Sequence, residues 1–402
     1  MNTEASHGAS QPSVLVVQRS SALDGSAHSG LLLADGLREA GWTTHVAFGS
    51  GGPIIERYAA SGHETHVVPH DSWLRRDRTH QFAKDAYLEW QKANAFRSLI
   101  EDTGADVVYL NTVVSLAGAI AAHRAELPCV WHLREMFVDI GGEMHAPNWA
   151  IPLVRWGIRR HADRLIANST ATARNLLGEN ASAATVIPNA VRSDFFDENR
   201  TQEEARAVFD LRPSGSIIGV PGTLRPMKGH PFFFNAVAPL LRTQDGRRVV
   251  VTGEGGGDFT HQLKAQIRDL GIQNRVSFLG WVEDMPAFYQ ACDLVCIPSR
   301  AEPFGRTAIE AFAVGTPVVA SAVGGLKEIV THGETGLLVP YDDEDALTDS
   351  LRRLLGSPDL RETTSANACQ EAEEKYHEQV YKERVATLVA EMMPYGDYLS
   401  GA

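Results

Sequence analysis

Short runs of β-branched and apolar residues alternate with helical stretches over most of the chain. In the first half, the strand-like runs VLVVQ, THVAF, THVVP, DVVYL, PCVWH, RLIAN and TVIP alternate with helical segments such as 30–40 and 116–124. A second series begins at SIIGVPG and continues through RRVVVTG, RVSFLG, DLVCIP, PVVAS and GLLVP. This alternation is typical of βαβ units that build parallel sheets. We therefore predict an α/β protein with two doubly wound, Rossmann-like domains.

The alternation lapses between the two series, and this lapse divides the chain. Residues 191–215 are polar and charged and end near a proline and a glycine, which favours a linker with one short helix. We expect residues 13–190 to form the first domain and residues 216–375 the second. Residues 1–12 are predicted to be a disordered lead, and the charged helical segment 376–402 to pack back across the domains.

Composition narrows the class of protein. The 402 residues carry a formal net charge of −13, which disfavours general binding of nucleic acids. The longest uncharged apolar-rich run, 311–326, is shorter than the roughly 20 residues that cross a bilayer and contains glycine and proline, so no membrane span is expected. The start of the chain lacks the pattern of a signal peptide, which favours a cytoplasmic location. Two of the four cysteines, Cys292 and Cys296, lie in an apolar strand and are expected to pack in the core.

The stretch PSRAEPFGRTAIEAFAVGTPVVAS carries the strongest candidate chemistry. A strand ends, a loop presents Glu302, and a helix begins near Gly305. The first backbone N–H groups of that helix lack intrahelical partners, so they suit a diphosphate in the cleft expected between the domains. Glu310 lies among apolar residues of the same helix and needs a partner. That partner is either a ribose diol or Arg306, which lies four residues earlier.

Two glycine-containing turns follow strands of the second series. In GVPGTLRPMKGH, Gly222 precedes Lys228 and Arg225, cations that are placed to neutralise a leaving diphosphate. The alternative for Lys228 is an ordinary solvated residue before a helix. In VTGEGGGDF, Gly253 and Glu254 either border the phosphate site or form a plain turn. The dinucleotide fingerprint GxGxxG is absent after the first strand, which argues against a dehydrogenase.

Histidines and clustered acids give no pattern typical of a metal site. His132 ends the run PCVWH and is expected to point into the cleft, where it is either a site residue or a hydrogen-bonded structural one. The other histidines show no ligand spacing. The acidic residues Asp343, Glu344 and Asp345 resemble a metal-binding DxD, but they begin a helix, and we interpret them as its N-terminal cap. We predict no metal.

Taken together, these stretches resemble the retaining glycosyltransferases of family 4, which have the GT-B fold of two facing Rossmann-like domains with a deep cleft. The most specific stretch is 278–340, which is similar almost throughout to the donor-binding half of the family. The segments GTLRPMKG, VIPNAV and DGSAHSGLLLADGLREAG match more weakly. The resemblance implies an N-terminal domain on the acceptor side and a C-terminal domain that binds a nucleotide-sugar.

The resemblance also implies roles for individual residues. Glu302 would contact hydroxyls of the donor sugar, Glu310 the ribose, and Lys228 the leaving phosphate. His132 matches a histidine near the sugar, and Gly25 matches a glycine-rich loop that reaches the diphosphate. The other substrate-binding positions are Gly222, Gly253, Glu254, Phe304, Gly305, Arg306 and Thr307.

Two positions depart from the family pattern. The family usually has an arginine directly after the glycine of GxLxxxKG, whereas this chain has Thr223 there, and we expect Arg225 to take its place. The early loop has Gly25 followed by Ser26 where the family usually has two glycines, which changes how closely the backbone approaches the donor.

The implied activity is transfer of a hexose-type sugar, with retained configuration, from a nucleoside-diphosphate sugar to a glycan, lipid-linked or small-molecule acceptor. It would need no metal or other cofactor and would serve polysaccharide, glycolipid or other envelope glycoconjugate synthesis. The alternatives are a catalytically silent homologue that acts as a binding partner, and a GT-B epimerase or phosphorylase. Segments 72–97 and 148–164 combine tryptophan with clustered arginine, which is typical either of amphipathic surface helices or of peripheral contact with the inner membrane face.

Overall fold

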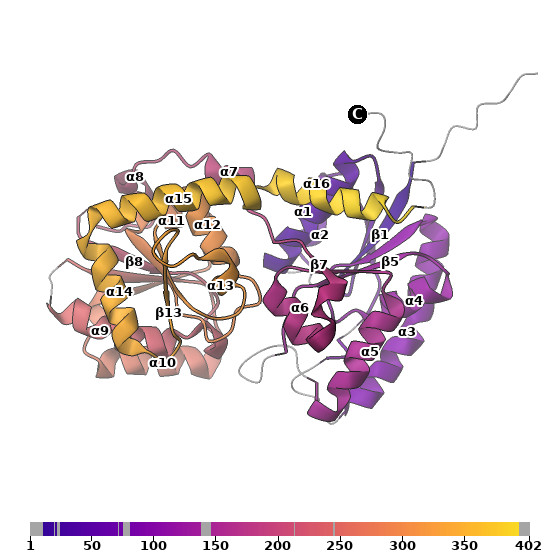
Figure 1. Cartoon of the computed structure of the whole chain (residues 1–402), viewed down its shortest axis with the longest axis horizontal. Helices are drawn as coiled ribbons and strands as arrows, with labels where there is room; N and C mark the ends of the chain where they lie inside the picture. Colours follow the sequence, from indigo (N-terminus) through magenta and orange to yellow (C-terminus); the bar gives the residue numbers. More distant parts are fainter. Residues whose placement is uncertain are drawn as a thin grey trace, which may run out of the picture.

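The computed structural model describes two α/β units that lie side by side (Figure 1). It describes residues 11–19, 21, 25–70, 72–74, 81–137, 146–212, 214–243 and 246–393. Most of the lead expected over 1–12, and the end of the chain beyond residue 393, lie outside the described residues. No helix in these ranges is long and apolar enough to cross a membrane.

The N-terminal unit is built on a parallel sheet. Its seven strands, as far as the chain is described, follow the order β3-β2-β1-β4-β5-β6-β7. They are β1 (Ser13–Gln18), β2 (Thr43–Phe48), β3 (Glu64–Val67), β4 (Val107–Leu110), β5 (Cys129–Leu133), β6 (Arg164–Ala167) and β7 (Ala184–Val186).

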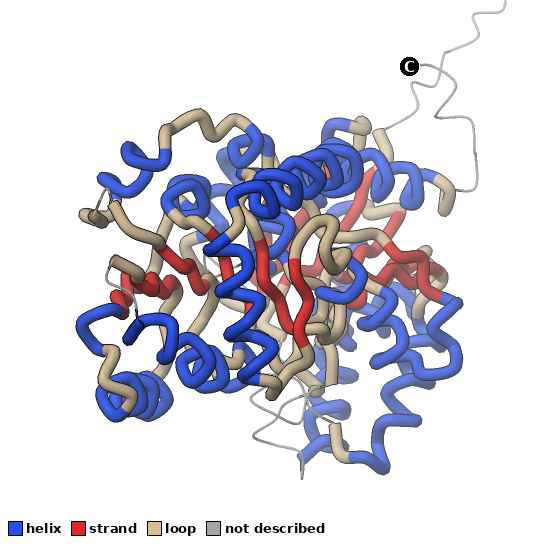
Figure 2. The backbone as a smooth tube through the Cα atoms, turned by 60° about the vertical axis from the view of Figure 1, so that its left-hand side comes forward, coloured by secondary structure: helices blue, strands red, loops and turns tan. Residues whose placement is uncertain are grey.

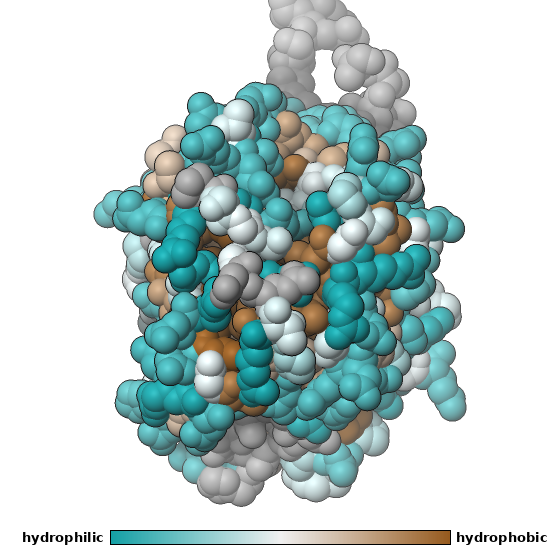
Figure 3. All heavy atoms as spheres, turned by 90° about the vertical axis from the view of Figure 1, so that its left-hand side faces the viewer, coloured by the Kyte–Doolittle hydropathy of each residue, from teal (hydrophilic) through white to brown (hydrophobic). Residues whose placement is uncertain are grey.

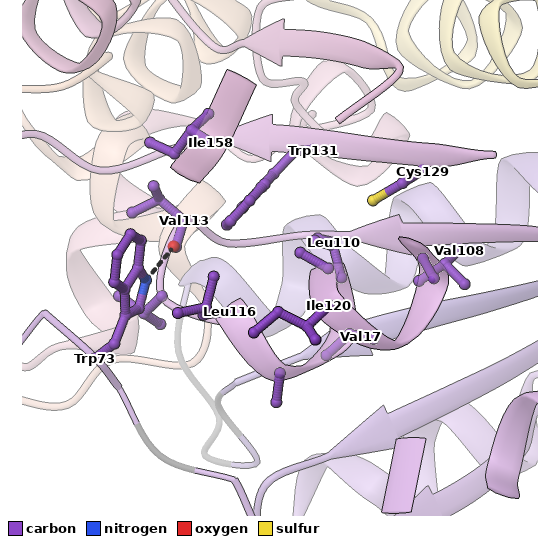
Figure 4. Close-up of a cluster of buried hydrophobic side chains, with 14 of the residues drawn as sticks. Val17, Trp73, Val108, Leu110, Val113, Leu116, Ile120, Cys129, Trp131 and Ile158 are labelled. Atoms are coloured by element: carbon purple, nitrogen blue, oxygen red, sulfur yellow. Dashed lines mark hydrogen bonds between the residues drawn. The ribbon is translucent and has the colours of Figure 1, made fainter. Parts of the chain in front are cut away.

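Helices cover both faces of this sheet, because successive side chains of its strands point to opposite sides. In β1, Leu15 and Val17 pack in one core with α3 (Phe82–Thr103) and α4 (Leu116–Arg124), whereas Val14 and Val16 pack in another with α1 (Gly25–Glu39). Figure 4 shows part of the first core, in which the Trp73 indole donates to the Val113 carbonyl at 3.1 Å. The helices are α1 (Gly25–Glu39), α2 (Ile54–Ala60), α3 (Phe82–Thr103), α4 (Leu116–Arg124), η2 (Asn148–Ala150), α5 (Ile151–His161), α6 (Thr170–Leu177) and η3 (Gly178–Ala183).

The C-terminal unit repeats this design with a sheet of order β10-β9-β8-β11-β12-β13, again parallel and between two helical layers (Figure 2). Cys292 and Cys296 are buried free thiols in its core, as predicted. The strands are β8 (Ile217–Val220), β9 (Arg248–Thr252), β10 (Val276–Gly280), β11 (Leu294–Ile297), β12 (Val318–Ser321) and β13 (Leu337–Val339). The helices are η4 (Pro226–Lys228), α9 (His230–Thr243), α10 (Gly257–Asp269), η5 (Gln273–Arg275), α11 (Met285–Ala291), α12 (Arg306–Val314), α13 (Leu326–Ile329) and α14 (Glu344–Gly356).

The segment expected as a linker contains two short helices, α7 (Ser193–Phe196) and α8 (Gln202–Val208). Helix α8 packs against α11 of the C-terminal unit. The buried Arg206 guanidinium lies 2.7 Å from the Asp293 carboxylate and donates to the Ala291 carbonyl at 3.1 Å. Helix α8 of this segment is therefore packed on the C-terminal unit.

Two consecutive helices tie the units together. Helix α15 (Pro358–Tyr376) packs on α12 of the C-terminal unit, and α16 (Glu378–Ala390) packs on α1 of the N-terminal unit (Figure 1). The return across the molecule thus begins in α15, before the expected segment 376–402, of which residues 376–393 are described. The outer face of the C-terminal unit, shown in Figure 3, is mostly hydrophilic. The molecule is a two-domain α/β protein of the doubly wound parallel type, as the sequence predicts.

Candidate functional site

A cavity of about 370 Å³ lies between the carboxyl ends of the two sheets. Its walls come from residues at or just beyond the ends of strands, where loops and helix N-termini converge. The N-terminal unit contributes Ser29, Arg134, Asn168 and Asn189. The C-terminal unit contributes Pro221, Gly222, Thr223, Lys228, Thr252, Gly253, Trp281, Val282, Met285, Glu302, Arg306, Thr307 and Glu310.

The N-terminus of α12 faces this cavity. Gly305 precedes the helix with φ 118°, a conformation that side chains rarely adopt. A Cβ atom on Gly305 would lie 2.7 Å from the Leu326 side chain, so the close turn requires glycine. The first N–H groups of the helix have no intrahelical acceptor and carry partial positive charge, and Arg306 and Thr307 line the cavity beside them. The arrangement suits an anion such as a phosphate group.

Glu302 and Lys228 form an ion pair at the wall of the cavity. Lys228 Nζ lies 2.7 Å from Glu302 Oε2, which also accepts from the Ser299 hydroxyl at 3.1 Å. Glu302 is only 8 % exposed, so its charge depends on these partners. The sequence placed both residues at strand ends but did not predict that they pair.

Glu310 lies one helical turn beyond the start of α12 and is held by two protein partners. Arg306 Nε lies 2.9 Å from Glu310 Oε1, so the ion pair given by their spacing is present. The Tyr289 hydroxyl donates to Oε2 at 2.8 Å. Burial and the Glu310 charge together raise the pKa of this tyrosine well above its usual value, so it stays a neutral donor. Glu310 still lines the cavity, next to the apolar side chains of Trp281 and Met285.

The glycine turns of the C-terminal unit pack against each other. Gly253 has φ 94°, and a Cβ atom there would lie 2.3 Å from the Gly222 carbonyl oxygen. Both glycines line the cavity, as does Thr223, whereas Arg225 follows at the start of η4 and is not among the lining residues. Glu254 is exposed outside the lining, and its carbonyl accepts from the Leu224 N–H at 3.0 Å.

On the N-terminal side, Arg134 is a cavity residue that sequence reasoning did not select. Its Nη2 atom donates to Asn189 Oδ1 at 2.8 Å and to the Tyr381 hydroxyl at 3.4 Å. Its buried Nε and Nη1 atoms have no hydrogen-bond partner among the described residues. Buried polar atoms without partners are costly, and Arg134 lines the cavity, so its unused donors make it a candidate contact for a ligand there. Its position directly after the strand β5 could have indicated that it lies at the cavity.

His132 does not line the cavity. Its ring is fully buried, and Nδ1 lies 2.8 Å from the Tyr109 hydroxyl, while Nε2 has no partner within the described part of the chain. Burial and the nearby Arg134 charge lower the pKa of His132 well below its usual value, so the ring is neutral. These contacts match the second of the two alternatives, a hydrogen-bonded structural residue. The expectation that His132 points into the cleft is not met.

Gly25, Phe304 and the acidic cluster at Asp343 were also singled out in the sequence. Gly25 is the first residue of α1, whose Ser29 lines the cavity. Phe304 is buried and packs its ring 6.2 Å from that of Tyr376. Asp343 caps α14 and accepts from the Ala346 N–H at 2.9 Å, so the interpretation of the acidic cluster as a helix cap is confirmed.

The two units also touch each other beside the cavity. The Glu328 carboxylate accepts from the backbone N–H groups of Thr170 and Ala171, at 2.8 and 2.7 Å, where α6 begins. From the same helix end, the hydroxyls of Ser169 and Thr172 donate to the Pro303 carbonyl at 2.5 and 3.1 Å. These bonds hold the loop that carries Glu302 against the N-terminal unit.

Comparison with known proteins matches both halves of the chain to family models. A model of Glycosyltransferase Family 4 matches residues 24–195, and a model of Glycosyl transferases group 1 matches residues 201–371. The lipopolysaccharide core biosynthesis mannosyltransferase LpsB of Rhizobium meliloti is 32% identical over 58% of this chain and 66% of its own length. A D-inositol 3-phosphate glycosyltransferase of Nocardia farcinica is 38% identical over 49% of this chain and 46% of its own length. The chain spans about half to two thirds of these relatives.

Solved structures share the fold over nearly the whole chain. Anabaena Alr3699/HepE in complex with UDP and glucose is 25% identical, with a TM-score of 0.78 over 94% of this chain and 99% of its own. The sucrose-phosphate synthase of Thermosynechococcus elongatus is 20% identical, with a TM-score of 0.77 over 95% of this chain and 99% of its own. The two sheets are thus those of the GT-B fold. Because the two models cover both domains, the chain belongs to the family 4 glycosyltransferases.

Proposed function

We propose that the protein transfers a hexose-type sugar from a nucleoside-diphosphate sugar to an acceptor, with retained configuration. The observation that carries the proposal is the convergence, in one interdomain cavity, of the α12 N-terminus, Lys228 and the buried Glu302. A helix N-terminus and a lysine suit the diphosphate, and a carboxylate beside them suits sugar hydroxyls. LpsB is named as a mannosyltransferase, and Alr3699/HepE was solved with UDP and glucose, which supports a hexose and a nucleoside diphosphate.

The donor would lie along the C-terminal wall of the cavity. Its diphosphate would bind the N–H groups at the start of α12, and its ribose would reach Glu310 one helical turn further along. Trp281, Val282 and Met285 form the apolar wall beside Glu310, which suits the flat face of a nucleobase. Arg134 would then face the sugar or the acceptor from the N-terminal side.

In the proposed transfer, the protein acts mainly by stabilising developing charge rather than by forming a covalent bond. The bond between the anomeric carbon and the phosphate oxygen breaks, and a bond from the acceptor oxygen to the same face of that carbon forms. The acceptor proton passes to the departing phosphate oxygen. Lys228 and the helix N-terminus meet the charge that develops on the diphosphate, in the role that a metal ion has in other enzymes, and Arg225 is proposed to add to them. Glu302 orients the sugar.

The acceptor would enter from the N-terminal unit and would be a glycan, a lipid-linked intermediate or a small molecule. We assign the reaction to polysaccharide, glycolipid or other envelope glycoconjugate synthesis, which the naming of LpsB supports. Closure of the units around the cavity would exclude water, which otherwise competes with the acceptor.

Nucleotide binding tests the donor site first. Thermal unfolding with UDP, GDP, ADP and CMP, with and without Mg²⁺, should show stabilisation by one nucleoside diphosphate without the metal. A ligand at one hundred times its dissociation constant adds about 2.7 kcal/mol to the free energy of unfolding. Glu310→Ala should weaken this effect strongly, whereas the control Glu334→Gln, an exposed carboxylate of the same domain, should not.

Product analysis tests the reaction itself. Incubation with the matching nucleotide-sugar and candidate acceptors should release free nucleotide and a glycoside with the anomeric configuration of the donor. Inverted product would exclude the retaining mechanism, and an altered nucleotide-sugar without acceptor would indicate an epimerase. Nucleotide binding without turnover on any acceptor would favour a binding role.

We also propose peripheral contact with anionic membranes through the N-terminal unit. The supporting observation is an aromatic ridge around the start of α5, made of Trp149, Leu153 and Trp156, which are 64, 54 and 57 % exposed. Arg159 and Arg160 are exposed on the same helix. Exposed tryptophan next to arginine is typical of surfaces that enter an anionic lipid interface.

Co-sedimentation with vesicles tests this contact. Vesicles rich in phosphatidylglycerol should pull down the protein, and pure phosphatidylcholine should not. Trp149→Ser with Trp156→Ser should abolish binding, whereas Val208→Ser, an exposed apolar residue of the other unit, should leave it unchanged. Failure to bind even the anionic vesicles would remove the proposal.

A further inference from the structure

Three potential metal ligands meet at the edge of the N-terminal sheet. The edge strand β3 pairs in parallel with β2, and the register sets Glu64 directly beside His45. His66 lies two residues after Glu64 and therefore on the same face of the sheet. The three side chains meet on that face near the edge of the sheet, and none of them is among the residues that line the cavity. The cluster is thus separate from the cavity.

The distances within this cluster match those of a metal site. His45 Nδ1 lies 3.3 Å from Glu64 Oε2 and 3.4 Å from His66 Nε2, and the three ligand atoms all lie within 4.8 Å of one another. Bonds of about 2.1 Å to zinc place tetrahedral ligand atoms about 3.4 Å apart. Two of the three edges therefore have the spacing of a zinc tetrahedron, and the third needs only a rotation of the exposed glutamate.

Burial divides the three ligands in a way that suits an ion with one open position. The His45 side chain is 7 % exposed, whereas that of Glu64 is 67 % exposed. The exposed side of the cluster leaves a fourth position for water. Two imidazoles and one carboxylate are the ligand types of borderline first-row ions.

We propose that His45, Glu64 and His66 bind one zinc-class divalent cation, with water as the fourth ligand. The ion joins the edge strand β3 to β2 and thereby fixes the outer rim of the N-terminal sheet. It takes no part in the sugar transfer proposed above, because none of its ligands lines the cavity. The proposal stands whether or not the protein transfers a sugar.

Zinc binding can be measured on tag-free protein stripped with a chelator. Titration of Zn²⁺ against a chromogenic chelator should give one site per chain, and X-ray absorption should show two imidazole nitrogens and an oxygen shell. His66→Asn and Glu64→Gln should each weaken binding at least tenfold. The matched control is His123→Asn, which breaks a pair of facing histidines, His123 and His161, on another part of the same unit.

Circular dichroism and thermal unfolding, neither of which needs a nucleotide, serve as the check that each variant is folded. The proposal is overturned if the stripped wild-type protein takes up no zinc at micromolar concentration. It is equally overturned if His66→Asn binds zinc as tightly as the wild type, or if His123→Asn is the variant that loses it.

Discussion

Lys228 and Glu302 form an ion pair at the cavity wall, so each neutralises the charge of the other. Lys228→Ala should reduce kcat about 10²- to 10³-fold, the usual effect of removing one group that stabilises developing charge. It should also lower the free energy of unfolding by about 1–3 kcal/mol, because a buried carboxylate loses its counter-charge. Turnover assays and urea unfolding measure the two effects.

A double variant separates stability from catalysis in this pair. Lys228→Ala with Glu302→Gln removes both charges and should recover most of the lost stability without recovering turnover. If Lys228→Ala alone keeps wild-type turnover, Lys228 has no role at the leaving phosphate.

Arg134 is the cavity residue with the most unsatisfied hydrogen-bonding capacity on the N-terminal side. If it faces the sugar or acceptor, Arg134→Gln should lower kcat/KM about 10- to 10²-fold and leave the affinity for the free nucleoside diphosphate within about threefold, since a hydrogen bond to a charged group contributes about 1.5–3 kcal/mol. Tyr381→Phe removes only the 3.4 Å contact and is the control. Equal loss of nucleotide affinity in Arg134→Gln would instead place the residue at the diphosphate.

Individual residues of the site were predictable where they follow a strand or lie in the first turns of the helix after it. Glu302, Lys228, Gly222 and Gly253 all lie just after strands of the C-terminal sheet, and parallel topology brings such positions together. Tyr289 was not predictable, because it reaches Glu310 from a different helix, and no local spacing encodes that contact.

The start of α9 contains a titratable group in an apolar setting. His230 is fully buried, neither ring nitrogen has a hydrogen-bond partner among the described residues, and burial lowers its pKa from 6.5 to about 4. Because the folded-state pKa lies below the unfolded value, only the unfolded chain takes up this proton as the pH falls from 6.5 to about 4. The free energy of unfolding should therefore fall by roughly 3 kcal/mol over that window.

Urea unfolding at several pH values measures this loss. His230→Gln should flatten the slope between pH 6.5 and 4, whatever its effect on stability at neutral pH. Fully buried His132 acts with the same sign, so part of the slope should remain in the variant. A slope identical to that of the wild type would assign the acid sensitivity to other groups.

The pattern of apolar residues predicted the helices and strands themselves better than it predicted which of them pack together. The strand-like runs predicted both sheets, since continuous apolar runs such as β1 and β9, whose alternate residues pack in opposite cores, are what a sheet between two helical layers requires. The packing of α8 on α11 was not predictable, because a short charged helix carries no apolar pattern that indicates which element it packs against. The cluster of His45, Glu64 and His66 was missed because its residues come together only through the register of β2 and β3.

Across the whole molecule, Glu328 links the C-terminal unit to the N-terminal unit. Its carboxylate accepts two N–H bonds at the start of α6, where the partial positive charge of the helix strengthens them. Beside it, Ser169 and Thr172 hold the carbonyl of Pro303, the residue after Glu302. The geometry of the sugar-binding carboxylate therefore depends on the contact between units.

Glu328→Gln should loosen this contact while leaving each unit folded. The amide keeps one acceptor but loses the charge, a change of about 1–2 kcal/mol that corresponds to a roughly 5- to 30-fold shift toward separated units. We expect kcat/KM to fall by a similar factor and the radius of gyration from small-angle scattering to increase, with unchanged thermal unfolding. Glu334→Gln, on an exposed turn of the same unit, should change none of these. If Glu328→Gln leaves both turnover and radius of gyration at wild-type values, the contact between the units is independent of this carboxylate, and the Pro303 bonds alone align the loop.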